Sequence, residues 1–334
     1  MSDRPPMPST SVVIATRDRA KLLQRCLSSL AQVDYPSFEV VIVDNAPTTE
    51  DTARLVTAAT GRPLDLRYAV ERRPGTAVAR NLGLTLAQGD IVAFIDDDVL
   101  VEPEWLRALV GGFAAAEDVA CVTGKVLPVS VEAPEQSWFD RWAGFSKGEE
   151  RTVYDLGEHA VSGPLYPYRI GLYGTGANAA FRTEKVRALG GYDETLGPGT
   201  PAKGGEDIDL FLRVILAGWR LVYEPAAVVR HHHSSDYRAL RRTVHGYGLG
   251  ASAVMTKYIV DPRTRRDVLR RLPAAALFTL RTSTTRGSGQ GSYSLRVLPM
   301  HLAGMVRGPF SYLRSRRQLG GARRPALKPP AGPG

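Results

Sequence analysis

Three adjacent carboxylates are the residues of this chain best suited to chemistry. Asp96, Asp97 and Asp98 directly follow Ile91–Ile95, an apolar run with the composition of a buried strand. Carboxylate oxygens are preferred ligands of hard divalent cations. A cation held here could bridge a diphosphate and neutralise the charge that grows as the phosphate leaves. The alternative interpretation is an acidic turn that caps the following helix.

A second acidic pair opens a predicted helix. Glu206 and Asp207 follow two glycines and precede an amphipathic stretch that extends to Ala217. Acids in the first turn of a helix are stabilised by the helix macrodipole and commonly serve only as caps. A carboxylate in this position could also remove a proton from a hydroxyl group as a general base. The residues alone leave both interpretations open.

Three histidines follow the predicted strand Arg220–Arg230. They are His231, His232 and His233. Adjacent residues on a strand point to opposite faces, so at most two of these imidazoles can share one site. One imidazole that joins carboxylates around a cation is therefore favoured over a zinc centre made of histidines alone. A polar surface turn is the alternative.

Arginines lie close to the turn Pro74-Gly75. Arg72 and Arg73 precede this turn, and Arg80 follows it in a predicted helix. Because the guanidinium fork pairs with two oxygens at once, arginine suits the recognition of a diphosphate. Arg80 could equally be a structural ion-pair partner.

Alternating strand-like and helix-like patterns must position these residues. Strands are predicted at Ser11–Ala15, Phe38–Val43, Leu64–Val70, Ile91–Ile95, Gly174–Arg182 (a turn and a strand) and Arg220–Arg230, and helices at Lys21–Ala31, Asp51–Thr60, Thr76–Ala87, Pro103–Ala116, Glu184–Leu189 and Glu206–Ala217. This alternation predicts βαβ units and a parallel sheet covered on both faces. Ligands of such sheets bind beyond the carboxyl ends of the strands, where Asp18, Asp44 and the acidic triplet Asp96–Asp98 are expected.

The composition is that of an ordinary globular protein. Of the 334 residues, 43% are hydrophobic and 23% are charged. The two cysteines, Cys26 and Cys121, are far apart, which disfavours a disulfide framework or a thiolate zinc site and makes a reducing cytosol the expected compartment. Residues 1–10 lack the features of a signal peptide, and no apolar run reaches the ~18–20 residues of a membrane-spanning helix.

The positive charge is concentrated at the C-terminal end. Residues 262–334 contain 15 Lys or Arg and one acid, which amounts to +14 within a net charge of +9, so residues 1–261 carry −5. The pattern from Tyr237 onward is helical and basic. It is compatible with peripheral attachment to an anionic membrane, or with simple packing on the rest of the protein. Nucleic-acid binding is disfavoured because aromatic residues are few and the arginines are scattered.

The pieces described above resemble, in their order, family 2 of the glycosyltransferases, which has the GT-A fold. The matching pieces are Val12-Val-Ile-Ala-Thr-Arg-Asp18, Val41-Ile-Val-Asp44-Asn45, Gly75 with Ala79-Arg80-Asn81-Leu-Gly83, Ile95-Asp96-Asp97-Asp98, Gly174-Thr-Gly-Ala-Asn178, Gly205-Glu206-Asp207 and Val229-Arg230-His231. The resemblance covers roughly residues 10–235, about two-thirds of the chain. Ala15 stands where the family commonly has Pro, and Asp18 where Asn is common.

The resemblance implies an α/β fold. We expect a GT-A-type, Rossmann-like, mostly parallel sheet flanked by helices, with a basic helical C-terminal extension. The expected organisation is a disordered N-terminus at residues 1–10, a catalytic domain at 11–235 with a nucleotide-sugar half at 11–128 and an acceptor half at 129–235, a helical extension at 236–319, and a disordered tail at 320–334.

The resemblance also implies inverting transfer of a sugar from a nucleotide sugar to a hydroxyl acceptor (a glycan, a lipid-linked molecule or a small molecule). UDP is the carrier favoured by the family, and GDP and dTDP remain open. The residues implied in substrate or nucleotide binding are Thr16, Arg17, Asp18, Asp44, Arg80, Asp96, Asp97, Gly176 and Asn178. Asp44 is expected to face the base and Asp97 to approach the ribose.

The implied cofactor is a divalent cation, Mn²⁺ or Mg²⁺. Asp98 is the expected direct ligand, Asp96 a supporting one, and His231 completes the site, with His233 as its alternative. Asp207 is the expected general base, with Glu206 as its rival. The aromatic segment 130–170 and the loop 197–205 are expected to bind the acceptor.

Two other classes of protein compete with the glycosyltransferase interpretation. A sugar nucleotidyltransferase has a glycine-rich phosphate loop after its first strand, but the corresponding turn, Thr16–Ala20, contains no glycine. A nucleic-acid-binding protein is the non-enzyme alternative. The glycosyltransferase interpretation predicts a cytoplasmic protein without a nucleic-acid partner, located at the inner face of the membrane if the extension binds lipid.

Overall fold

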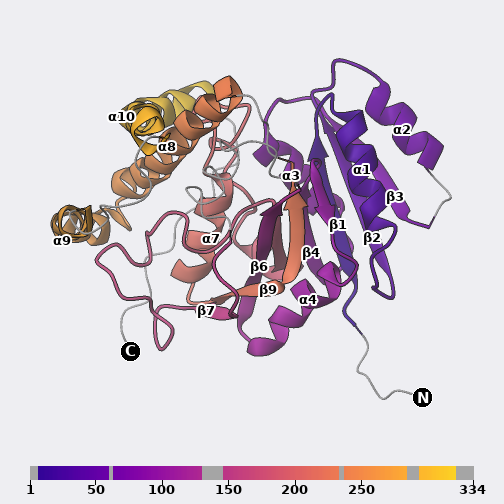
Figure 1. The fold of residues 1–334 in the computed structure, drawn as a ribbon, viewed down its shortest axis with the longest axis horizontal. Helices are drawn as coiled ribbons and strands as arrows, with labels where there is room; N and C mark the ends of the chain where they lie inside the picture. The colour runs from indigo at the N-terminus through magenta and orange to yellow at the C-terminus, as the bar shows by residue number, and fades with distance from the viewer. Residues whose placement is uncertain (1–6, 60–62, 130–145, 233–236, 284–292, 321–334) are drawn as a thin grey trace.

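The computed structural model describes residues 7–59, 63–129, 146–232, 237–283 and 293–320, which fold around one central sheet (Figure 1). Its strands are β1 (Thr10–Thr16), β2 (Phe38–Asn45), β3 (Asp65–Glu71), β4 (Ile91–Asp96), β5 (Val99–Val101), β6 (Val119–Pro128), β7 (Thr152–Tyr154), β8 (Asn178–Arg182) and β9 (Arg220–His231). The strand order is β3-β2-β1-β4-β8-β6-β9-β5, and β7 also pairs with β9.

The sheet is mixed. Strands β3, β2, β1 and β4 are parallel, as the βαβ pattern predicts, and β6 is parallel to β9. Strand β8 runs antiparallel to both β4 and β6, and β5 and β7 run antiparallel to β9. The expected α/β class is therefore confirmed, but the parallel arrangement does not extend across the whole sheet.

Helices cover both faces of the sheet because its strands are apolar on both sides. The helices of this part are α1 (Ala20–Leu30), α2 (Asp51–Ala59), α3 (Thr76–Leu86), α4 (Trp105–Gly111) with the 3₁₀ turn η1 (Gly112–Ala115), α6 (Thr183–Ala188) and α7 (Glu206–Leu216). In β1, Val12 and Ile14 pack toward α1, α2 and α4, while Val13 packs on the opposite face toward α3, α6 and α7. The two cysteines, Cys26 and Cys121, are free and buried.

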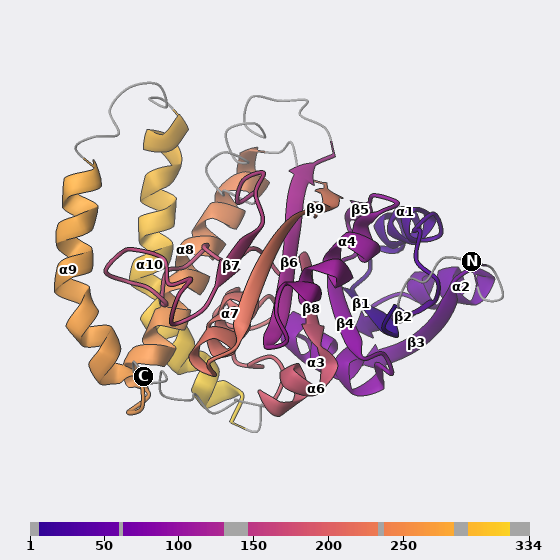
Figure 2. The same ribbon diagram turned by 90° about the horizontal axis from the view of Figure 1, so that it is seen from below.

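Three helices form the C-terminal extension, as expected. They are α8 (Tyr237–Val260), α9 (Arg265–Ser283) and α10 (Tyr293–Gln318). Helices α8 and α10 pack side by side, and α9 stands at the outer end of the molecule (Figures 1 and 2). Within the described part of the chain, none of the helices has the length and apolar character needed to cross a bilayer.

Three strands have no counterpart in the sequence prediction, namely β5, β6 and β7. Strand β6 lies inside the sheet between β8 and β9, so its omission matters most. The predicted helix Pro103–Ala116 begins at Trp105 and tightens into the 3₁₀ turn η1 at Gly112. The terminal segments expected to be disordered lie mostly outside the described residues, at 1–6 and 321–334.

Candidate active site

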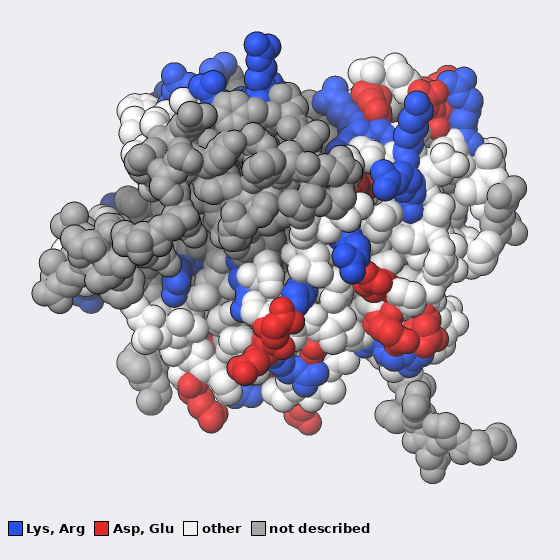
Figure 3. All heavy atoms as spheres, viewed as in Figure 1, with Lys and Arg blue, Asp and Glu red and all other residues white. Residues whose placement is uncertain are grey.

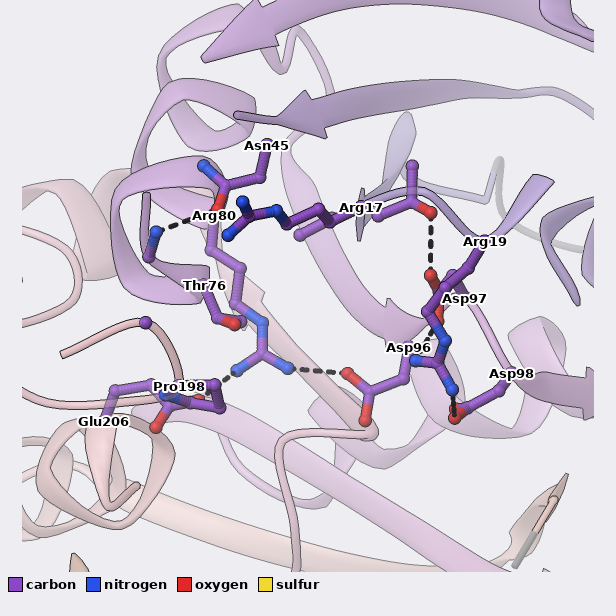
Figure 4. A pocket seen from close by; sticks show the side chains of 14 residues that line it. Arg17, Arg19, Asn45, Thr76, Arg80, Asp96, Asp97, Asp98, Pro198 and Glu206 are labelled. Carbon is purple, nitrogen blue, oxygen red and sulfur yellow. Dashed lines mark hydrogen bonds and ion pairs between the residues drawn. The ribbon is translucent and has the colours of Figure 1, made fainter. Parts of the chain in front are cut away.

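A cavity of about 410 Å³ opens at the carboxyl ends of β1, β2 and β4 (Figure 4). Its lining residues are Ala15, Thr16, Arg17, Arg19, Asn45, Gly75, Thr76, Arg80, Asp96, Asp97, Asp98, Pro198, Gly199 and Glu206. The location is the one expected for a ligand of a sheet of this kind. The acidic triplet therefore lies in the wall of a crevice and is not simply a cap of the next helix.

Asp97 is buried in the cavity wall, between β1 and β4. It accepts hydrogen bonds from Thr16 Oγ1 and from Arg19 Nη1, each at 2.7 Å. Burial raises the pKa of Asp97 to about 6, although the charge of Arg19 and the Thr16 hydroxyl oppose this shift. Asp97 thus links the ends of two parallel strands.

Asp98 meets His231 through a short antiparallel ladder. Val99, the first residue of β5, pairs with His231, the last residue of β9. His231 Nε2 lies 3.2 Å from Asp98 Oδ1 and 4.0 Å from Asp96 Oδ2. Although burial opposes both shifts, the contact of Asp98 with His231 raises the pKa of the imidazole and, together with Arg19, holds the pKa of Asp98 well below its usual range.

These side chains fit a divalent cation. Asp96, Asp98 and His231 each offer a ligand atom, and these atoms all lie within 4.8 Å of one another. Two carboxylates and one imidazole suit Mn²⁺ or Mg²⁺ better than they suit a structural zinc centre. The alternative ligand, His233, lies outside the described residues.

Arg80 connects the acidic triplet to the second acidic pair. Its buried guanidinium donates to Asp96 Oδ1 at 2.8 Å, to Glu206 Oε1 at 3.1 Å and to the carbonyl oxygen of Gly176 at 3.3 Å. Figure 4 shows Arg80 between these two carboxylates. Arg80 is therefore both a structural ion-pair partner and a residue of the site.

A second cavity, of about 510 Å³, adjoins the first. Arg80, Asp96, Pro198 and Glu206 line both cavities. The other residues that line the second cavity are Lys147, Ile170, Gly171, Gly174, Thr175, Gly176, Ala177, Lys203, Gly204, Gly205, Asp207, Ile208, Gly246, Tyr247, Gly250, Ala251, His301 and Met305. The loop 197–205, which was expected to bind the acceptor, therefore contributes Pro198 and Lys203–Gly205 to this cavity, together with residues of α8 and α10.

Asp207 faces the second cavity from the first turn of α7. Its Oδ2 accepts a hydrogen bond from the backbone N–H of Gly176 at 2.7 Å. A Cβ at Gly176 would lie 2.8 Å from Asp207 Cβ and 3.0 Å from Arg80 Nη1, so only glycine permits this close approach. Gly176 therefore contributes its backbone N–H to the site.

Glu206 is buried beside Asp207. Burial, together with repulsion by Asp207, raises the pKa of Glu206 to about 7, and the Arg80 guanidinium opposes the shift. Gly205 precedes this pair with φ +91, a conformation that L side chains rarely adopt. The glycine directly before the acidic pair therefore has a structural reason.

Two of the acids expected to bind the nucleotide line neither cavity. Asp18 accepts hydrogen bonds from the backbone N–H and the hydroxyl of Thr48, at 2.8 and 2.9 Å. Asp44 is fully buried and accepts a hydrogen bond from the hydroxyl of Tyr68 at 2.9 Å, and burial raises its pKa. Asn45, the next residue, lines the first cavity instead.

Asn178 lies in the sheet interior. Its side chain accepts from Trp105 Nε1 at 2.9 Å, and it donates to the carbonyl oxygens of Lys125 at 3.1 Å and Ala227 at 2.8 Å. These bonds join β8 to β6, β9 and α4. The structure thus gives Asn178 a role in holding the sheet together, in place of the expected contact with substrate.

In the described part of segment 130–170, the tyrosines are core residues. Tyr154, Tyr166 and Tyr168 are buried, whereas Trp138 and Trp142 lie outside the described residues. Sequence reasoning also missed Arg19 in the first cavity and Tyr247 in the second. A lone arginine in a turn and a lone tyrosine in a basic helix carry no motif, so only the fold reveals their position.

The mixed sheet flanked by helices, with a cluster of acidic side chains at its strand ends, is the architecture of GT-A glycosyltransferases. The chain belongs to glycosyl transferase family 2, whose model matches residues 11–183. It is 31% identical over 239 residues to the pre-mycofactocin glycosyltransferase of Mycobacterium tuberculosis, an alignment that covers 68% of this chain and 43% of the relative. The chain therefore spans less than half of the length of that relative.

Other similar proteins support the same fold. The glucosyl-dolichyl phosphate glucuronosyltransferase of Haloferax volcanii is 26% identical over 226 residues, which cover 66% of this chain and 68% of that protein. A mannosyltransferase from Pyrobaculum calidifontis, solved with GDP-Man and Mn²⁺, has a TM-score of 0.60 and 22% identity and covers 92% of this chain and 89% of its own. TarS of S. aureus, solved with UDP-GlcNAc, has a TM-score of 0.54 and 18% identity over 92% of this chain and 81% of its own.

Proposed function

We propose that this chain is a divalent-metal-dependent, inverting glycosyltransferase that moves a sugar from a nucleotide sugar to an acceptor hydroxyl. The observation that carries the proposal is the junction of two cavities at Arg80, Asp96 and Glu206. One cavity is bordered by ligands suited to a cation, and the other contains a carboxylate suited to act as a base. The structural relatives with GDP-Man and UDP-GlcNAc support a nucleotide sugar as the donor.

The first cavity is proposed to bind the donor. Asp98, Asp96 and His231 would hold the cation, which would stabilise the negative charge that develops on the leaving nucleoside diphosphate. Arg17 lines the same cavity and can pair with diphosphate oxygens, as a guanidinium does well. UDP is the carrier proposed first, as the family suggests.

The second cavity is proposed to bind the acceptor. Asp207 lies in its wall, and its Oδ2 is fixed by the Gly176 N–H. An acceptor hydroxyl is a weak nucleophile, and Asp207 would remove its proton as the oxygen attacks the anomeric carbon. A single base on the side opposite to the leaving group gives inversion without a covalent enzyme intermediate.

Ligand-induced stabilisation tests the donor half of the proposal. UDP, GDP and dTDP are each added with and without Mn²⁺ or Mg²⁺, and the melting temperature is recorded. A ligand that binds only the native state raises that temperature, so at least one nucleotide should stabilise the protein in the presence of metal. If no nucleotide gives a metal-dependent shift, the proposed donor site is wrong.

Product identity tests the type of reaction. With a sugar-labelled nucleotide sugar and a panel of hydroxyl acceptors, the label should move to an acceptor while nucleoside diphosphate is released. Release of pyrophosphate from a sugar phosphate and a nucleoside triphosphate would instead assign the chain to the sugar nucleotidyltransferases. The anomeric configuration of the product, read by NMR, decides between inversion and retention.

A further inference from the structure

The C-terminal helices are fixed to the catalytic part of the molecule by buried polar contacts. Lys257 Nζ of α8 lies 2.7 Å from the carboxylates of both Asp193 and Asp209. The hydroxyl of Ser315 on α10 donates to the carbonyl oxygen of Thr195 at 2.6 Å. These contacts hold α8 and α10 in one position relative to the second cavity.

One face of α10 is turned toward α8. A Cβ at Gly304 would lie 2.2 Å from the carbonyl oxygen of His245, and a Cβ at Gly308 would lie 1.8 Å from Ser252 Oγ. Glycine at these positions lets the two helix backbones approach closely. Tyr312, one turn after Gly308, is buried on the same face. Gly304, Gly308 and Tyr312 therefore form the inner face of α10.

The outer face of α10 is apolar and exposed. Its side chains are Leu302 (50% exposed), Met305 (42%), Val306 (70%), Phe310 (74%) and Leu313 (40%). Their spacing places them together on one side of a helix with 3.6 residues per turn, away from the glycine face. Single exposed apolar residues are ordinary, but a contiguous row of large ones marks a binding surface. We call this row the outer stripe.

The extension around the outer stripe is strongly basic. Residues 237–320 contain 16 Lys or Arg and two acids, Asp261 and Asp267. Arg307 and Arg314 each follow a residue of the outer stripe directly in the sequence and are exposed. Figure 3 shows basic side chains along the edge above α8 and α10, where no acidic side chain of the described residues is visible in this view.

The outer stripe borders the mouth of the second cavity. Met305 belongs to the stripe and also lines that cavity, as Tyr247 of α8 does. Asp207, the proposed base, lines the same cavity. A surface bound to the outer stripe would therefore lie beside the opening through which an acceptor reaches Asp207.

We propose that the outer stripe of α10 seats the protein on an anionic lipid surface, with the mouth of the second cavity at that surface. An amphipathic helix with an apolar row and flanking arginines buries the row among the lipid chains and attracts anionic headgroups. Such a placement suits an acceptor that is anchored in the membrane. This last consequence rests on the proposed function, whereas the membrane contact does not.

Charge favours lipid over a second copy of this chain as the occupant. Two copies that met through their outer stripes would bring two strongly basic extensions together, and like charges across an interface are costly. An anionic lipid surface offers both an apolar interior and opposite charge. The test below distinguishes these occupants.

The test is co-sedimentation of the full chain with vesicles of phosphatidylcholine alone or of phosphatidylcholine with phosphatidylglycerol. The double variant Val306→Asp/Phe310→Asp interrupts the outer stripe and lowers the net charge by two. Arg25→Glu, at an exposed position of α1, changes the net charge equally and serves as the matched control. The metal-dependent nucleotide shift of each protein shows independently that the fold and the donor site are intact.

The wild-type protein and Arg25→Glu should sediment with the anionic vesicles, and the double variant should partition at least about tenfold less, because two large apolar side chains no longer enter the lipid. Equal partitioning of the double variant, or no sedimentation of the wild type with anionic vesicles, would overturn the proposal. The proposal would also be overturned if the wild type did not bind vesicles but formed a dimer, seen by sedimentation velocity, that the double variant abolished. None of these readouts depends on transferase activity.

Discussion

Arg80 donates a 3.1 Å hydrogen bond to Glu206, and this contact separates the roles of two adjacent carboxylates. Glu206 is buried and paired with the guanidinium, so this carboxyl group is held at the junction of the two cavities. Asp207 is half-buried and faces only the second cavity, where its Oδ2 is oriented by the Gly176 N–H. Both carboxylates line the second cavity, and this difference in pairing is why Asp207 is proposed as the base.

Removing the charge of Asp207 should stop chemistry but leave donor binding in place. Asp207→Asn is expected to lower turnover by roughly 10²–10⁴-fold, the usual contribution of a general base. The metal-dependent nucleotide shift should be unchanged because Asp207 does not line the first cavity. Turnover is measured as nucleoside diphosphate released per enzyme, and Glu206→Gln provides the comparison. Near-normal turnover of Asp207→Asn with a large loss in Glu206→Gln would transfer the role to Glu206.

Loss of a cation ligand should remove the metal dependence of nucleotide binding. Asp98→Ala is expected to abolish the Mn²⁺-dependent rise in melting temperature with UDP, and His231→Ala to reduce it. Glu104→Gln removes a carboxylate that is 70% exposed at the start of α4 and should behave as the wild type. A full metal-dependent shift in Asp98→Ala would show that the cation is held elsewhere.

The sequence located the acidic residues of the site better than it located their partners. Asp96, Asp97 and Asp98 follow an apolar run and do lie in the wall of a cavity at the strand ends. His231 could be brought to them only by analogy, because the strand that aligns it, β5, has three residues and no pattern to detect. Its pairing with β9 is a tertiary event that local sequence does not encode.

Burial explains the parts that the sequence did not predict. Strand β6 is buried on both faces for most of its length, so it lacks the period-two alternation that marks a half-exposed strand. Asn178 and Asp44 are polar residues in motif positions, but whether their partners are ligands or neighbouring groups depends on the fold. Asn178 is fully engaged by its neighbours, and Asp44 is buried and accepts a hydrogen bond from Tyr68.

The raised pKa of Glu206 predicts that the free energy of unfolding falls as the pH rises toward neutrality. In the folded protein its pKa is about 7, against an ordinary value of 4.5, so the native state binds the proton more tightly than the unfolded state. The contribution of Glu206 to the free energy of unfolding is therefore fully present below pH 4.5 and is lost as the pH rises through 7. Glu206→Gln cannot titrate, so the free energy of unfolding of the wild type relative to this variant should fall across that window. Urea unfolding in EDTA at several pH values measures the difference, and a flat difference would contradict the assigned environment.

Lys257 is expected to couple the stability of the extension to that of the catalytic part. Its ammonium group is buried and lies 2.7 Å from both Asp193 and Asp209. Lys257→Met keeps the aliphatic stem but leaves these carboxylates without that cation, and breaking a buried ion pair typically costs about 3–5 kcal/mol. Asp209 retains its contact with Arg213 at 2.8 Å, so the lower end of this range is expected. Urea unfolding of the full chain should show the loss in one transition, with Lys21→Met, at an exposed position of α1, as the control. If only the helices of the extension melted earlier, while the rest unfolded as in the wild type, the extension would be an independent unit, and Lys257 would not fix α8 beside the second cavity.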